Sequence, residues 1–266
     1  VSAGTYYENI NFNGKNIAVI GEDRETTIIS ANEPGISTVI EPYILKSVTV
    51  TNTSSLNGDN GADDSHAIYG GYIVDDCIIT NNYYGGVLGT ENVLNSIISN
   101  NYINTNHNPY HSSGYTSFQY QDNFYIYNTE FFGNNCGNNC YASNIMLQQG
   151  ADLGILEKVF IIDENTSAQA TIILYPNANL TILNSTIINN TSHSAIKREL
   201  QFADLSILNS IIHKTVDTEY PDWQIFGCQY AEQNPCNINY SLINNLDLLD
   251  YVNGNGNIDI DPLFCD

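Results

Sequence analysis

The sequence is poor in basic residues. It has 7 Lys+Arg against 29 Asp+Glu, which gives a formal net charge of −22 over 266 residues. Phosphate backbones and anionic membrane surfaces repel so acidic a chain, so we expect no nucleic-acid partner. The sequence also lacks the run of about 20 apolar residues that a membrane-spanning helix needs. We therefore expect no direct insertion into a membrane.

A helical pattern is missing as well. No segment carries a sustained apolar stripe with the 3.6-residue period of an amphipathic helix. The chain is instead rich in Asn, Ile and Tyr, with 39, 34 and 19 residues. Disordered acidic chains are poor in aromatic and β-branched residues, whereas this chain is 42% hydrophobic. The composition therefore predicts a folded protein built from β-strands.

A short motif recurs along the chain. Apolar residues alternate with other residues, and the alternation ends in an apolar pair that Asn often follows. The copies are YILKSVTVTNT (43–53), YIVDDCIITNN (72–82), NVLNSIISNN (92–101), YIYNTEFFGNN (125–135), GILEKVFIIDENT (154–166), LTILNSTIINNT (180–191), LSILNSIIHKT (205–215) and NINYSLINN (237–245), after a looser first member, NGKNIAVIGE (13–22) with ETTIIS (25–30). Alternation with period two in segments this short predicts β-strands.

Repeats of about 25 residues made of short strands predict a solenoid of about nine coils, in which like residues stack on like. We expect the apolar pairs to form inward columns. The Asn after each pair is predicted to form a ladder of amide hydrogen bonds at a turn, made by Asn52, Asn81, Asn100, Asn134, Asn189 and Asn244. Small residues are expected to point inward at a second bend, namely Ser47, Cys77, Ser96, Thr129, Ser185, Ser210 and Ser241.

Two segments frame the repeats, AGTYYENINFNGKNIAVIGEDRETTII (3–29) and GNGNIDIDPLF (254–264). They are similar to the opening coil and the closing stretch of right-handed parallel β-helix proteins, the pectin-lyase-like superfamily, and in particular of its bacterial secreted and surface members. The resemblance implies an all-β fold, a single right-handed parallel β-helix domain over residues 1–266. It leaves the function open, because the superfamily includes lyases, hydrolases, esterases, adhesins and phage proteins.

The N-terminal capping helix of such proteins is missing from this sequence. The end of a solenoid exposes unpaired strand edges and must be covered. Either the capping helix has been removed, or another protein surface covers this end, for instance that of a second copy stacked along the solenoid axis. Such a head-to-tail contact would build a filament.

Catalytic motifs have little support, and we predict no catalytic residue. Uronate lyases need a cation at the substrate carboxylate and a base, and Lys197-Arg198 is the only adjacent basic pair. Asp75-Asp76 resembles the paired aspartates of β-helical polygalacturonases, but neighbours on a strand face opposite sides. A solvated strand end explains that pair better. A carbohydrate-active enzyme, either a polysaccharide hydrolase or a lyase, stays an alternative.

One loop has the composition of a calcium site. LNGDNGADDSHA (56–67) places the oxygen ligands that Ca²⁺ prefers on a Gly-bent segment, and the candidate ligands are Asp59, Asn60, Asp63 and Asp64. Acidic Gly-containing turns also occur without metal, so both interpretations stay open. No other cofactor is indicated.

Six Cys residues favour an oxidising compartment, and thus an extracellular or cell-surface location. Two pairs lie close enough in sequence for local disulfides, Cys136 with Cys140 and Cys228 with Cys236. Cys77 sits at an inward repeat position, where a buried free thiol is expected.

Two aromatic insertions interrupt the repeats, at residues 102–124 and 216–236. Loops on a rigid scaffold often carry specificity, and aromatic faces suit sugar rings or a protein partner. The candidate ligand-binding residues are Tyr102, Tyr110, Tyr115, Phe118, Tyr120 and Trp223. The equal alternative is that these rings fold onto the flank of the solenoid.

Glycosylation sequons occur at about the frequency that chance predicts for this composition. Five Asn residues are candidate acceptors, namely Asn165, Asn179, Asn184, Asn190 and Asn239. Two further sequons, at Asn52 and Asn189, fall on the predicted ladder, where the amide would be engaged.

The sequence favours a secreted or cell-surface protein with a structural or adhesive, non-catalytic role. The partners that this interpretation predicts are copies of the same chain and polysaccharide. A glycan-binding module is the other alternative besides an enzyme.

Overall fold

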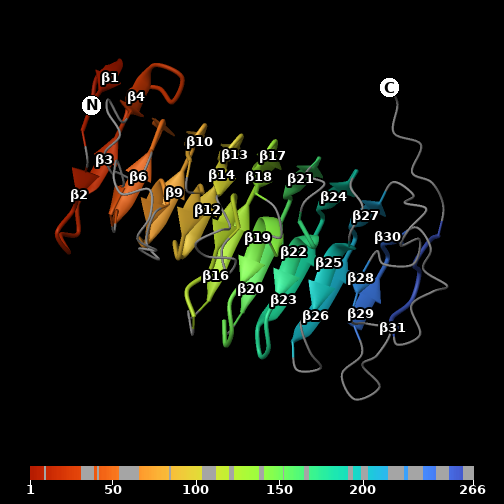
Figure 1. Ribbon diagram of the computed structural model, residues 1–266. Coiled ribbons are helices and arrows are strands. Elements are labelled where there is room, and N and C mark those ends of the chain that lie inside the picture. The colour runs from red at the N-terminus through yellow and green to blue at the C-terminus, as the bar shows by residue number, and fades with distance from the viewer. Residues whose placement is uncertain are drawn as a thin grey trace.

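The computed structural model describes residues 1–8, 10–30, 39–40, 42–53, 66–83, 85–103, 112–119, 123–137, 141–151, 153–164, 168–190, 194–198, 203–214, 225–226, 236–243 and 252–259. All regular secondary structure within these ranges is β-strand, and all strand pairs are parallel. Figure 1 shows the strands stacked along one axis, from the first coil in red to the last in blue. The predicted all-β parallel solenoid is confirmed.

The coils contribute strands to three sheets, here called A, B and C. Sheet A consists, in spatial order, of β1 (Gly4–Tyr6), β4 (Thr27–Ser30), β7 (Thr49–Thr51), β10 (Ile78–Thr80), β13 (Ile97–Ser99), β17 (Glu130–Phe132), β21 (Phe160–Asp163), β24 (Thr186–Asn189), β27 (Ile211–Lys214) and β30 (Leu242–Ile243). Sheet B consists of β2 (Ile10–Asn11), β5 (Val39–Ile40), β8 (Ile68–Tyr69), β11 (Val87–Leu88), β15 (Tyr115–Thr116), β19 (Ala142–Leu147), β22 (Ala170–Leu174), β25 (Ser194–Arg198) and β28 (Ile225–Phe226).

Sheet C completes the coils. It consists of β3 (Ala18–Ile20), β6 (Ile44–Lys46), β9 (Ile73–Asp75), β12 (Asn92–Leu94), β16 (Phe124–Tyr127), β20 (Gly154–Glu157), β23 (Asn179–Leu183), β26 (Asp204–Leu208), β29 (Cys236–Asn239) and β31 (Val252–Asn253). A small fourth sheet pairs β14 (Tyr102–Ile103) with β18 (Asn135–Cys136). Sheets A and C have ten strands each, close to the predicted coil number.

The core is a set of inward columns, one from each sheet. Ile79, Ile98 and Phe131 stack in register in sheet A and are fully buried. The apolar pairs do not both point inward as predicted. Because side chains alternate along a strand, only one residue of each pair enters the core. It is the second in Ile78-Ile79 and the first in Ile187-Ile188, and the other residue is half-buried on the outer face.

The bend from sheet C to sheet A carries a residue with positive φ, then a small inward residue. The inward Ser96, for example, donates its hydroxyl to the carbonyl of Leu94 and accepts the amide of Cys77 from the preceding coil at 3.1 Å. Ser185 and Ser210 repeat this pattern. In the second coil the inward position belongs to Val48, because Ser47 holds the positive φ. The prediction for Ser47 was therefore wrong by one residue.

The bend from sheet A to sheet B contains an Asn ladder, which is displaced by one position from the predicted one at Asn82 and Asn101. Its members are Asn82, Asn101 and Asn134, which are buried and joined by amide hydrogen bonds of 2.9 and 3.2 Å. Asn81 and Asn100 instead adopt positive φ at the turn, a conformation that Asn tolerates better than most residues.

The remaining predicted members of the Asn ladder differ. Asn52 also has a positive φ and is exposed. Asn189 is buried at the end of β24, but it bonds Thr171 and Ser194 in place of another ladder amide. Asn244 lies outside the described residues. Of the predicted members, only Asn134 belongs to the ladder.

Candidate functional site

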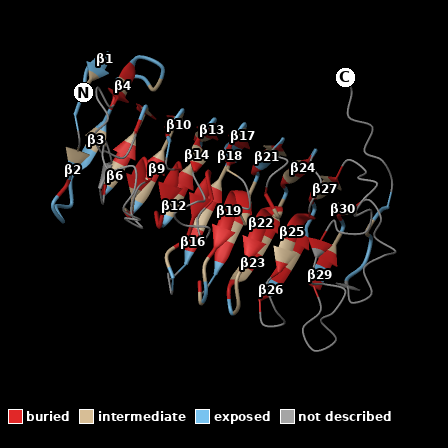
Figure 2. Ribbon diagram, in the orientation of Figure 1, coloured by how far each residue is buried: buried red, intermediate tan, exposed pale blue. Residues whose placement is uncertain are grey.

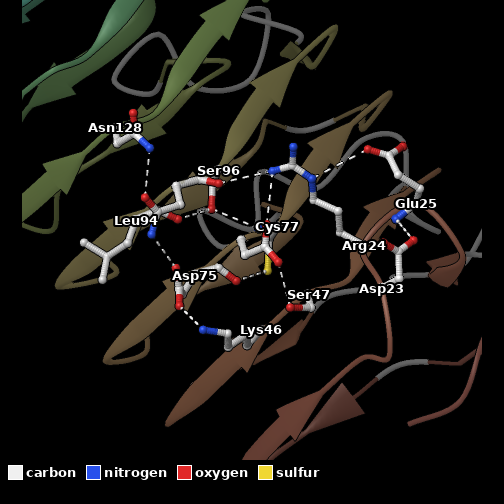
Figure 3. A network of polar contacts seen from close by, with 12 residues as sticks. Asp23, Arg24, Glu25, Lys46, Ser47, Asp75, Cys77, Leu94, Ser96 and Asn128 are labelled. Atoms are coloured by element: carbon white, nitrogen blue, oxygen red, sulfur yellow. Dashed lines mark hydrogen bonds and ion pairs between the residues drawn. The ribbon is translucent and has the colours of Figure 1, made fainter.

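A network of charged and polar residues lies on the bend between sheets C and A of the first coils (Figure 3). Lys46 Nζ donates to Asp75 Oδ2 at 2.6 Å, and Asn95 Nδ2 donates to Asp75 Oδ1 at 2.8 Å. The neighbouring Asp76 accepts the Ser47 hydroxyl at 2.8 Å. The network therefore links three successive coils.

Arg24 completes this network. Its Nη1 lies 3.3 Å from Asp76 Oδ1 and donates to the backbone carbonyl of Asn95 at 3.2 Å. Both carboxylates of the Asp75-Asp76 pair are thus neutralised by a cation from a preceding coil. The two side chains leave the chain in different directions, since Asp75 ends a strand and Asp76 has a positive φ of 54°.

The protonation state of Asp75 suits an ion pair. Burial works to raise the pKa of its carboxyl, but the hydrogen bonds from Lys46 and Asn95 outweigh burial, and the pKa lies below its ordinary value. The hydrogen bond to Asp75 raises the pKa of Lys46 in turn. A general acid for glycoside hydrolysis needs a raised pKa, so this carboxyl is tuned in the opposite direction.

Asp75→Asn should remove a small, pH-dependent contribution to stability. Because the folded pKa of Asp75 is depressed, its contribution is present above the unfolded value of about 3.9 and is lost as the pH falls through the folded pKa. Exposed ion pairs contribute about 0.5–1 kcal/mol, and Lys46 is 43% exposed. Urea titrations at several pH values would show a deficit at pH 7 that vanishes in acid.

The matched control is Lys46→Met, alone and combined with Asp75→Asn. The double variant should lose no more stability than the two single variants lose in sum, because each single change already removes the same ion pair. A deficit for Asp75→Asn that stays constant down to pH 2 would contradict the ion-pair assignment.

Cys77 follows the Asp pair and is the free cysteine among the described residues. It is fully buried, with Sγ 3.2 Å from the carbonyl oxygen of Asp75, and burial raises the pKa of its thiol to about 12. Reactive cysteines have depressed pKa values and accessible sulfurs. Cys77 is therefore a core residue, as predicted, and no nucleophile.

The outer face of sheet C carries further pairs between coils. Tyr125 donates to Glu157 Oε2 at 2.6 Å, and burial together with this hydrogen bond raises the pKa of Tyr125 to about 12. Lys158 Nζ donates to the hydroxyl of Tyr127 at 2.8 Å and lies 5.0 Å from the centre of its ring. These polar groups are therefore engaged with the neighbouring coil.

The basic pair Lys197-Arg198 is divided between two sides of sheet B. Lys197 Nζ donates to Gln169 Oε1 at 2.6 Å on the outer face. Arg198 is buried, with Nη1 2.9 Å from Sγ of Cys236, and burial lowers the pKa of its guanidinium. The two cations cannot clamp one substrate carboxylate together.

The structure places three of the predicted ligand-binding aromatics. Tyr115 is fully buried in β15, with its hydroxyl bonded to the Thr90 carbonyl at 2.8 Å, so its ring belongs to the core. Phe118 is half-buried, 5.3 Å from the ring of Tyr69. Tyr102 is half-buried beside Tyr83, with ring centroids 5.1 Å apart. For Tyr115 and Phe118, the structure thus favours the alternative in which the rings fold onto the solenoid.

A pair of exposed tyrosines was not predicted as a candidate site from the sequence. Tyr43 and Tyr72 precede β6 and β9 at equivalent repeat positions, and their rings stack at 5.6 Å with an angle of 15°. They are 39% and 43% exposed. The signal was the Tyr that begins both YILK and YIVD, at a position where later copies of the motif differ.

Several predicted site residues lie outside the described residues. These are the aromatics Tyr110, Tyr120 and Trp223, the calcium-site candidates Asp59, Asn60, Asp63 and Asp64, the sequon Asn165, and Cys140 and Cys228. Within the ranges given above, no group of three or more His, Cys, Asp or Glu side chains is arranged to hold a metal. The calcium site stays a prediction.

The cysteine predictions are tested in part. Cys136 and Cys236 are each disulfide-bonded, and no disulfide joins two described residues. Their predicted partners, Cys140 and Cys228, lie outside the described residues, so the two local pairings stay predictions.

The sequons differ in exposure. Asn184 and Asn190 are exposed, and Asn184 has a positive φ at a bend. Asn179 and Asn239 are half-buried in β23 and β29. Modification at any of these four positions stays a prediction.

The comparisons with known proteins add no family to this geometry. No family model, curated protein or solved structure matches the chain. Among the described residues, no helix is long and apolar enough to cross a membrane.

Proposed function

We propose that the protein is a non-catalytic structural or adhesive β-solenoid of the extracellular space or cell surface. The observation that carries this proposal is the engagement of polar side chains between coils. Asn101 in the interior, Ser96 at the inner bend and Asp75 at the surface each bond the next or the preceding coil. Side chains used in this way stiffen a rod. We also propose that the protein is a right-handed β-helix of the pectin-lyase-like superfamily, which its first and last segments resemble.

The proposed assembly is a stack of copies of the protein along the solenoid axis. β1, β2 and β3 each begin their sheet, and the inward side chains of Ile10 and Val19 are only partly buried against the core. Figure 2 shows exposed residues gathered at this first coil in pale blue. A coil from a second copy would bury this surface and pair the strand edges, and a head-to-tail contact of this kind extends into a filament.

Val19→Asp should abolish association while Ile20→Asp leaves it unchanged. The side chain of Val19 points into the core on β3, the first strand of sheet C, where a charge resists burial under a second copy. Ile20 is its neighbour on β3, is 50% exposed and points outward to the side. Sedimentation velocity over a range of concentrations would measure the effect. Equal association of both variants, or a monomeric wild type at high concentration, would contradict stacking.

Glycan binding is a second candidate function, and the stacked pair of Tyr43 and Tyr72 favours it. Exposed aromatic faces suit sugar rings, and this pair spans two coils on a rigid bend. Replacing both tyrosines by Ala should weaken binding to a responsive polysaccharide at least about tenfold, since aromatic contacts contribute of order 1–2 kcal/mol. Tyr240→Ala removes a 64% exposed ring on another coil and should leave binding unchanged. Equal affinity of the double variant and the wild type would reject this site.

A further inference from the structure

The outer face of sheet A is apolar along most of the rod. From β10 to β30 its strands lie side by side, and their outward residues form two columns in register (Figure 1). The first column contains Ile97, Phe160 and Ile211. Ile97 and Ile211 are half-buried, and Phe160 is 37% exposed. Because neighbouring coils cover the flanks of each side chain, the part that stays exposed is the outward tip.

The second outward column lies two residues further along the same strands. Phe132, Ile162 and Ile188 follow one another in register on β17, β21 and β24, and each is half-buried. The residue between the two columns, such as Ile161, is fully buried in the core. The alternation therefore places both columns on the outside of the solenoid. We call the outward residues of the sheet A strands from β10 to β30 the sheet A strip.

The outer face of sheet B is apolar as well, but it is covered. Met146 and Ile173 are paired on the neighbouring strands β19 and β22 and lie on the side away from the main core. Neither side chain has exposed surface, and both belong to a second hydrophobic cluster. The sheet A strip keeps its apolar tips exposed, and it is therefore a surface that an external partner can cover.

The distribution of charge indicates a second copy of the chain as that partner. Among the outward residues of the strip, Glu130 is the only Asp, Glu, Lys or Arg. The outer face of sheet C, in contrast, carries Lys46, Asp75 and Glu157. A net charge of −22 makes copies of the chain repel one another. Two strips can meet with little of this repulsion, and the contact buries apolar tips on both sides.

The area of the strip determines when two copies can pair. It spans seven strands, and at about 4.8 Å between strands and about 3.3 Å for each of three residues it measures roughly 34 by 10 Å, or about 350 Å². A standard interface buries about 800 Å² per partner, so two single rods offer too little area to pair. Three copies stacked end to end offer about 1,000 Å² as one rigid surface, and each added copy strengthens the contact through multivalency.

We propose that filaments of this protein pair side by side, with the sheet A strip of one filament packed against the same strip of the other. Packed sheets lie about 10 Å apart, and a contact that uses the same strip on both sides is self-complementary. The inference rests on the stacking proposed above, because stacking supplies the length that single rods lack. Glu130 opposes the pairing, since the contact takes its carboxylate out of water.

Electron microscopy of filaments formed by matched variants tests the pairing. The wild type should form paired filaments. Ile162→Glu adds a charge to the strip and should leave single filaments of unchanged length. Thr181→Glu adds the same charge at a half-buried position on the outer face of sheet C and should pair as the wild type does. Glu130→Gln removes the opposing carboxylate and should pair at a severalfold lower protein concentration.

The wild-type measurement decides even where a variant fails to fold. Wild-type filaments that stay single at every concentration, including filaments that bind a polysaccharide through this face, would overturn the pairing and leave the stacking intact. A wild type that forms no filaments would overturn both proposals. Loss of pairing in Thr181→Glu, or undiminished pairing in Ile162→Glu, would show that the sheet A strip is not the contact.

Discussion

Asn101→Ala is expected to destabilise the solenoid by about 3 kcal/mol, because it leaves several buried polar groups without partners. The side-chain oxygen of Asn101 accepts the backbone amide and the side-chain amide of Asn82, and its nitrogen donates to the carbonyl of Ile79 at 2.9 Å. Alanine can replace none of these bonds. The free energy of unfolding from a urea titration measures the loss.

Asn92→Ala is the matched control for the interior ladder. Asn92 also donates its side-chain amide to a backbone carbonyl of a neighbouring coil, that of Tyr72 at 3.1 Å, but it lies on the outer face, where water can substitute. Its replacement should cost less than about 1 kcal/mol. Equal losses in the free energy of unfolding for the two variants would contradict the special contribution of the buried ladder.

Gly114→Ala is expected to destabilise by about 3 kcal/mol through overpacking between coils. A methyl group at Gly114 would overlap the backbone carbonyl oxygen of Asn144 on the next coil and lie 3.0 Å from the ring of Phe131. Gly86, one coil earlier, has the same constraint, since its methyl group would lie 2.7 Å from the carbonyl oxygen of Gly114. The backbones of three coils therefore approach too closely at this column for any side chain, and thermal and urea unfolding would both report the strain.

Gly14→Ala separates this packing effect from a general effect of glycine replacement. Gly14 has a positive φ of 67°, but no heavy atom lies within 4 Å of the position of its added methyl group. The expected cost is only the conformational one, about 1 kcal/mol. A Gly14 variant as unstable as the Gly114 variant would contradict the proposed close approach.

The repeat pattern predicted the fold because, in stacked coils, a period of two largely determines which side chains face inward. The second Ile of the pair in CIIT and its equivalents must face inward once neighbouring coils align, as Ile79 and Ile98 do. The same rule, applied strictly, would have corrected the expectation that both residues of a pair point inward. Alternation alone thus predicts the core columns.

The one-residue errors at the bends have a common cause. Asn81-Asn82 and Asn100-Asn101 each offer two amides, and only the backbone conformation decides which one points inward. The first of each pair takes the positive φ, which turns the second into the interior. Ser47 likewise takes the positive φ and turns Val48 inward, but here the β-branched Val48 indicated the choice, because such residues rarely adopt a positive φ. Residue types that tolerate both positions cannot reveal the choice from sequence.

The burial of Tyr115 could not be predicted from the sequence for a different reason. Tyr115 belongs to a two-residue strand that pairs with Val87 and Ile145, and two residues carry no detectable period. The burial of Asp163, Asn189 and Lys214, which end β21, β24 and β27 in register, could not be predicted either, because polar residues at the ends of strands usually mark solvent. These strands of sheet A continue for one residue more than β17 of the preceding coil.

Electron microscopy of the purified protein over a range of concentrations tests the central proposal, a stiff non-catalytic solenoid that stacks along its axis. Ten coils at about 4.8 Å each make a single rod close to 50 Å long. We expect straight rods that lengthen by whole multiples of this unit as the concentration rises, and we expect the Val19→Asp variant to form only the single unit. Single units at every concentration, in the wild type as in the variant, would contradict it.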